Sequence, residues 1–246
     1  MQTICQLENF KIIYQDDYLV AIHKPAGLLV HPSPIDKHET QFATQILESL
    51  LNQPVFPIHR LDKATSGILL FALNSQTANQ VSQQMQNQLI QKHYLAIVRG
   101  WIPEIGETHL PLKQHFDKMV KQSQIDKPDQ NASTYWKRLD TSTLEIPLNK
   151  FSSQRYSLIK LSPTTGRKHQ LRRHLNALSY PIIGDVSHGD RNHNHLFHEQ
   201  LGQHRLYLAA TELHLTHPSL KTPLSITAPL EPSFVKACHF LNFSQP

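Results

Sequence analysis

Residues 68–73 form a short, uninterrupted apolar stretch, and this feature constrains the fold more than any other part of the chain. Such a run between turn-forming residues is typical of a strand buried on both faces of a sheet. The polar segment 59–67 leads directly into it and contains Asp62. A carboxylate beside a buried strand costs free energy unless it is paired. We therefore expect Asp62 to have a partner and a chemical role, the alternative being a side chain that caps a turn.

Short strands joined by turns make up most of the remaining pattern. Residues 12–14 and 19–22 predict a hairpin around an acidic turn. Further strands are predicted at 28–30, 94–98, 134–139, 156–161, 206–215 and 223–227. Apolar residues at helical spacing predict three helices, at 40–51, 75–90 and 168–179, the second capped by Asn74 or Ser75. We expect edge structure and loops in the rest of 110–154, and a polar, histidine-rich loop at 190–204.

This order of elements favours an α+β fold with a mixed, largely antiparallel sheet flanked by helices and loops. No repeat or linker divides the 246 residues, so we expect a single domain over 1–246. The two cysteines have neither metal-binding nor disulfide spacing. The first ten residues do not resemble a signal peptide, and no apolar run is long enough to span a membrane. We therefore expect a cytoplasmic protein without a membrane partner.

Positive charge is concentrated in residues 160–191, which carry six Lys or Arg side chains against two Asp. The whole chain has a net charge of +5 and a pI of about 9.2. Arg172 and Arg173 lie on the predicted helix at 168–179, whose leucines face the core, so the cations face outward or into a cleft. Such a stripe fits contacts with RNA phosphates. A solvated helix face is the alternative.

Several classes of enzyme are excluded because their motifs are missing. The sequence contains no glycine-rich phosphate loop, no Gly-x-Ser-x-Gly elbow and no His-Glu-x-x-His. A histidine cluster follows Asp190: His193, His195, His198 and His204. This cluster lacks cysteine, and polar loops collect histidine without metal, so we expect no metal site there.

Five segments, in order, resemble the motifs of the RluA-type pseudouridine synthases. They are residues 21–31, 59–67, 91–100, 161–172 and 181–185. Together with their spacing, the resemblance covers about residues 12 to 218. It implies a catalytic domain of that family, without the N-terminal S4 domain of many relatives that modify rRNA.

The resemblance assigns catalytic roles to three residues. Asp62 would be the catalytic residue in a reaction that breaks the N-glycosidic bond of a uridine, turns the base and rejoins it through carbon. Whether it attacks the anomeric carbon, attacks the pyrimidine ring or removes a ribose proton stays open. Arg167 would pair with Asp62 and keep it ionised. Tyr94 would lie against the base and handle the proton lost from carbon 5.

The same resemblance implies how RNA is held. Arg60 would fill the gap left by the extruded uridine. Arg172 and Arg173 are expected to bind the substrate because of the charge stripe described above. His59 and His169 would hold loops by hydrogen bonds. An isomerisation needs no metal and no redox cofactor. These roles require the segments around residues 62, 94 and 167 to converge on one cleft.

Residues 166–175 and 181–190 are most similar to the family members that act on uridine 65 of tRNA, in the T arm. His188 stands where many relatives have Tyr. We therefore expect a tRNA-modifying monomer. The alternatives are a uridine of rRNA as substrate and a non-catalytic RNA-binding protein on the same fold. A glycoside hydrolase would need two carboxylates about 5–10 Å apart, and no second acid pairs with Asp62 in the sequence.

Overall fold

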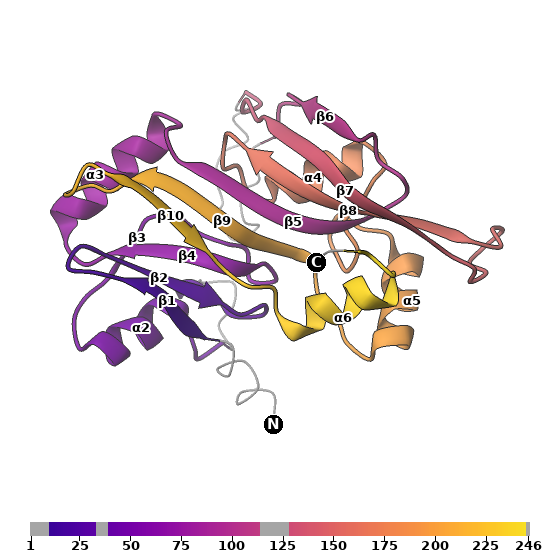
Figure 1. The fold of residues 1–246 in the computed structure, drawn as a ribbon, viewed down its shortest axis with the longest axis horizontal. Helices are drawn as coiled ribbons and strands as arrows, with labels where there is room; N and C mark the ends of the chain where they lie inside the picture. Colours follow the sequence, from indigo (N-terminus) through magenta and orange to yellow (C-terminus); the bar gives the residue numbers. More distant parts are fainter. Residues whose placement is uncertain (1–9, 33–38, 114–127, 245–246) are drawn as a thin grey trace.

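The computed structural model describes residues 10–32, 39–113 and 128–244. Their strands form one 10-stranded sheet in the order β1-β2-β4-β9-β5-β8-β7-β6, with β3 beside β4 and β10 beside β9 (Figure 1). Neighbouring strands are antiparallel except β4 and β9, which are parallel. The predicted α+β class and mixed, largely antiparallel sheet are therefore confirmed.

The strands are β1 (Lys11–Gln15), β2 (Leu19–Lys24), β3 (Phe56–Pro57), β4 (Ser66–Ala72), β5 (Gln91–Arg99), β6 (Ile105–Thr108), β7 (Thr134–Leu144), β8 (Gln154–Pro163), β9 (Leu208–Thr216) and β10 (Pro223–Thr227). The helices are α2 (Ala43–Leu51), α3 (Ser75–Gln86), α4 (Gln170–Ala177), α5 (Arg191–Leu201) and α6 (Pro232–Phe240).

Local signals placed several elements correctly. In the turn between β1 and β2, the Asp16 carboxylate accepts hydrogen bonds from the backbone N–H groups of Tyr18 (2.7 Å) and Leu19 (2.8 Å). Asn74 caps α3 as predicted, because its side chain accepts from the Thr77 N–H at 2.8 Å. Of the region 110–154, residues 134–144 form β7, which lies near an edge of the sheet beside β6, whereas residues 114–127 lie outside the described residues.

Two predictions of secondary structure are wrong. The expected loop at 190–204 contains α5, which the Asp190 side chain caps and whose buried face includes Leu196, Phe197 and Leu201. The polar residues between these positions conceal their helical spacing. The expected strand at 28–30 is reduced to one bridge between Leu29 and Phe42. Helix α6 was not predicted.

Helices cover both faces of the sheet. Leu47 of α2 packs with Ile22, whereas Val81 of α3 packs with the adjacent Ala21, so these helices lie on opposite faces. In the other half of the sheet, Leu175 of α4 packs on the face of Val98, and α5 and α6 pack on the face of Ile97. Four apolar clusters are thus arranged around a single sheet.

Gly67 allows the two halves of the sheet to meet. It pairs with Ala210 at the parallel contact of β4 and β9, and its φ is +105°. A Cβ atom there would lie 2.0 Å from the Ala210 carbonyl oxygen, so a larger residue would separate the strands. Because the segment 59–65 directly precedes β4, this contact places that segment beside β5 and β9.

Candidate active site

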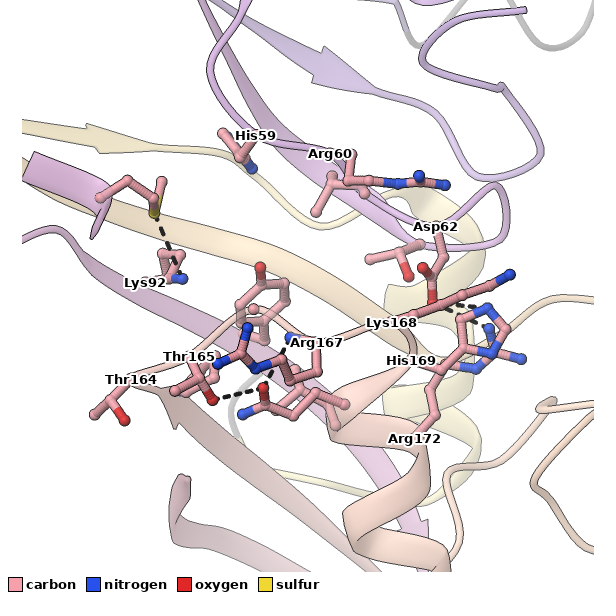
Figure 2. A pocket seen from close by; sticks show the side chains of 18 of the residues that line it. His59, Arg60, Asp62, Lys92, Thr164, Thr165, Arg167, Lys168, His169 and Arg172 are labelled. Carbon is pink, nitrogen blue, oxygen red and sulfur yellow. Dashed lines mark hydrogen bonds and ion pairs between the residues drawn. The ribbon is translucent and has the colours of Figure 1, made fainter. Parts of the chain in front are cut away.

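The predicted convergence of three distant segments is confirmed. Asp62, Tyr94 and Arg167 all line one cavity of about 610 Å³, formed by the segments 58–65, 85–94 and 163–172. Figure 2 shows Asp62 and Arg167 in this lining. Its described lining contains five Lys or Arg side chains, and Asp62 is the carboxylate among them. A cavity of this charge suits a polyanionic ligand.

Asp62 sits in a turn directly before β4. The backbone N–H of Thr65 donates to the Asp62 carbonyl at 3.0 Å, and the neighbouring Leu61 side chain is buried. The Asp62 side chain itself is 23 % exposed and points toward α4, where Arg172 Nη1 donates to its Oδ2 at 3.0 Å (Figure 2). The carboxylate is therefore paired yet still accessible from the cavity.

Arg172 is fixed by a second acid behind the cavity. Its Nε and Nη2 donate to the two oxygens of Asp185 at 2.7 and 2.8 Å. Asp185, whose side chain has no exposed surface, also accepts from the N–H groups of Ser187 and His188. Burial alone would raise the pKa of Asp185, but these hydrogen bonds and the charge of Arg172 lower it. Arg172 is thus an oriented donor held between two carboxylates.

The prediction that Arg167 pairs with Asp62 is wrong in the described structure. Arg167 is exposed at the cavity wall, and its Nε donates to the Asn131 carbonyl at 3.1 Å. Its backbone N–H is held by Gln170 Oε1 at 3.0 Å, in the loop that precedes α4. Arg172, in the first turn of the helix and 6 % exposed, takes the position next to Asp62. The start of the helix at Gln170 separates the two arginines into different environments.

The remaining substrate-binding candidates differ in position. Arg60 is exposed and lines the cavity, so its side chain can reach an incoming ligand (Figure 2). Arg173 is partly buried, and its Nη1 donates to the Lys113 carbonyl at 3.0 Å. It is not among the described residues that line the cavity.

Tyr94 lies on β5, where it pairs with Leu161 of β8 and Ala210 of β9. Its ring packs against the apolar cluster under α4 and faces the cavity. Burial raises the pKa of Tyr94, and the negative charge of Asp62 adds to this effect. The phenol is therefore protonated at neutral pH.

Two histidines lie near Asp62: His59 supports its loop, and His169 lies next to its carboxylate. The Leu70 N–H donates to His59 Nε2 at 3.1 Å, which confirms the predicted loop-holding role. His169 contacts His188 through a 3.0 Å hydrogen bond between Nδ1 and Nε2, and its own Nε2 lies 3.8 Å from Asp62 Oδ2. Burial lowers the pKa of His169 to about 4 despite the nearby carboxylate, so the ring is neutral at pH 7.

Lys24 is a supporting residue that the sequence did not single out. It is fully buried, and its Nζ donates to the carbonyls of Pro25, Leu28 and Lys63 at 2.8–3.1 Å. The Lys63 carbonyl also accepts from the Gly27 N–H. Burial lowers the pKa of Lys24 to about 7, but three carbonyl acceptors use all three protons of the ammonium form. This lysine anchors the loop next to Asp62.

The three histidines of α5 and the following His204 have separate contacts. His193 Nδ1 is hydrogen-bonded to the Tyr156 hydroxyl at 3.0 Å, and His195 pairs with Glu199. The His198 ring stacks on His204 with centroids 3.5 Å apart. Within the described residues, these four side chains do not come together as a group of metal ligands.

Comparison with known proteins points to one family. The RNA pseudouridylate synthase family matches residues 18–177. The chain is 50% identical over 222 residues to the tRNA pseudouridine synthase C of Vibrio cholerae, covering 90% of this chain and 91% of that protein. It is 49% identical over 220 residues to the Haemophilus ducreyi protein of the same name, covering 89% and 90%. The structure of human RNA pseudouridylate synthase domain containing 4 has a TM-score of 0.71 at 29% identity, over 96% of this chain and 94% of that one.

Proposed function

The chain belongs to the RNA pseudouridylate synthase family, and from this premise we propose that it isomerises one uridine of tRNA, at position 65 in the T arm, with Asp62 as the catalytic residue. The family makes it an isomerase. The tRNA substrate is supported by the similarity to the tRNA pseudouridine synthases C of Vibrio cholerae and Haemophilus ducreyi. The observation that carries the catalytic assignment is the accessible Asp62 carboxylate, held by Arg172 in a cavity otherwise lined by cations.

The proposed reaction breaks the bond between N1 of uracil and the ribose anomeric carbon, rotates the base and forms a bond from that carbon to C5. Asp62 either attacks a carbon or removes a ribose proton in the first stage. Whenever Asp62 is present as the free carboxylate, the guanidinium of Arg172 stabilises its negative charge. The C5 proton leaves in the last stage.

The protonation of Tyr94 restricts its part in that last stage. A protonated phenol donates a hydrogen bond and does not accept a proton until it has lost its own. We therefore assign Tyr94 to contact with the uracil ring. Asp62, the carboxylate among the described lining residues, is the anionic group able to accept the C5 proton.

Two other functions fit the cavity less well. A glycoside hydrolase would need a second carboxylate about 5–10 Å from Asp62, and the described lining supplies no other acid. A non-catalytic RNA-binding protein would not need a carboxylate among five cations, because an anion there weakens phosphate binding.

The decisive experiment maps pseudouridines in total RNA from cells with and without the gene. We expect one pseudouridine in the tRNA T arm to disappear and to return with the wild-type chain but not with Asp62→Asn. Loss of an rRNA pseudouridine instead would identify rRNA as the substrate. An unchanged map would contradict the enzymatic assignment.

Arg60 provides a test of base flipping. If it occupies the space vacated by the uridine, Arg60→Ala should lower kcat/KM on folded T-arm RNA by roughly 10- to 100-fold, because unstacking costs a few kcal/mol. A short unstructured RNA with the same sequence should lose much less. Lys236→Ala on α6 removes one charge outside the described cavity lining and should change neither rate. Equal losses on both RNAs would assign Arg60 to ordinary phosphate binding.

We also propose that residues 1–246 act as a single catalytic domain and as a monomer in the cytoplasm. Among the described residues, no helix has the length and apolar character needed to cross a membrane. Size-exclusion chromatography with light scattering tests the monomer, and a dimer mass would contradict it.

A further inference from the structure

Three potential metal ligands lie together on β5 and β9, away from the candidate active site. Lys92 and Tyr94 line the cavity, whereas His93 between them does not. Tyr94 pairs with Leu161 of β8, whereas His93 contacts the neighbouring residue Ser162, so His93 lies on the opposite face of the sheet. His93 pairs directly with Glu212 of β9, and His214 lies two residues further along the same strand. Strand pairing therefore brings two imidazoles and one carboxylate to the same patch.

The geometry of this group is close to that of a metal centre. One ligand atom from each of His93, Glu212 and His214 lies within 4.8 Å of the others. His214 Nε2 and Glu212 Oε2 are already 3.4 Å apart. A tetrahedral zinc ion with bonds of about 2.0–2.1 Å separates its ligand atoms by about 3.4 Å. Small rotations of side chains that are about one-third exposed, such as His214 at 34%, would complete the arrangement.

Each histidine is also oriented by a serine. His93 Nδ1 is hydrogen-bonded to Ser162 Oγ of β8 at 2.8 Å, and His214 Nδ1 to Ser225 Oγ of β10 at 2.5 Å. Metal-bound histidines typically use their second nitrogen in this way, which fixes the ring and leaves Nε2 for the ion.

Lys160 is the group that opposes a cation at this site. Its Nζ contacts both oxygens of Glu212, at 2.7 and 2.9 Å. A carboxylate offers about four lone-pair positions, so Oε2 can bind an ion while Oε1 keeps the lysine. The ammonium nevertheless repels a divalent cation and lowers its affinity.

We propose that His93, Glu212 and His214 form a binding site for a divalent transition metal of the zinc class, on the sheet face opposite the candidate active site. Two imidazole nitrogens and one carboxylate oxygen are a donor set that zinc prefers, with the fourth position left to water. The site is independent of the proposed function, because it shares no residue with the cavity.

The test is calorimetric titration of ZnCl₂ into untagged protein that has been dialysed against a chelator. We expect saturable binding of one ion per chain, and a Co²⁺ absorption spectrum of tetrahedral type. His93→Ala and His214→Gln should each abolish this binding while circular dichroism and melting temperature show a folded protein. Ser162→Ala should weaken it by about tenfold, because the His93 ring loses its orienting partner.

Two matched variants separate this site from general binding by histidines. His195→Ala removes an exposed histidine of α5 that pairs with Glu199, and should leave zinc affinity unchanged. Lys160→Met removes the opposing charge and should raise affinity by roughly tenfold. The proposal is overturned if no saturable site exists, if His93→Ala and His214→Gln bind like wild type, or if Lys160→Met does not bind more tightly.

Discussion

Asp62→Asn is expected to abolish pseudouridine formation while leaving the fold and RNA binding intact. Asparagine has almost the same shape as aspartate and keeps an oxygen that can accept from Arg172, but it has no negative charge and is a poor nucleophile and base. Removal of a covalent catalyst or essential base lowers kcat by roughly four orders of magnitude or more. The cations of the cavity remain, so RNA should bind at least as tightly as it does to wild type.

The measurement is release of tritium from tRNA labelled at C5 of uridine, with binding followed by filter retention. Asp190→Asn is the matched control, because Asp190 is also a carboxylate paired with an arginine, Arg99 at 2.5 Å, but does not line the described cavity. That control should keep its activity at temperatures where it is folded. Substantial tritium release by Asp62→Asn would refute the catalytic assignment.

The sequence was most informative where its motifs act locally. Asp62 and Tyr94 reach the cavity as predicted because a turn before β4 and a position on β5 determine their directions. The signals for α5 were also present in the sequence, as Asp190 at the N-cap and Gly202 at the left-handed C-cap. Histidines and other polar residues separate the apolar positions of α5, so their helical spacing does not stand out in the sequence.

The identity of the partner of Asp62 could not be predicted by the same reasoning. Arg167 and Arg172 are five residues apart in one motif, and both are cations near the same predicted helix. What separates them is the backbone at His169, where φ is +54° and the helix begins. The contacts of Lys24 could not be predicted from the sequence either. Its hydrogen bond to the Lys63 carbonyl joins positions 39 residues apart and depends on tertiary packing.

Arg172→Met should destabilise the protein by roughly 3–5 kcal/mol, because it leaves the Asp185 carboxylate buried without its cation. Arg167→Met should change stability by about 0.5 kcal/mol or less, since that side chain is exposed. Urea denaturation at pH 7 compares the two variants directly. A larger loss for Arg167→Met would contradict the assignment of the buried ion pair to Arg172.

A double variant separates the structural role of Arg172 from its catalytic role. In Arg172→Met with Asp185→Asn the buried charge is gone, and the amide oxygen can still accept from the N–H groups of Ser187 and His188. Most of the lost stability should return, because removal of both charges avoids the cost of an unpaired ion. Activity should stay roughly 10²–10³-fold low, because Asp62 still lacks its oriented donor.

Turnover of the refolded double variant is the deciding measurement, compared with Arg167→Met at the same fraction folded. If the double variant is as stable and as active as wild type, Arg172 serves only to pair Asp185. If Arg167→Met is instead the variant that loses turnover while folded, the charge that assists Asp62 comes from Arg167 after RNA has bound. If the double variant is stable and is the only one of the two with low turnover, Arg172 is the residue that controls the Asp62 carboxylate.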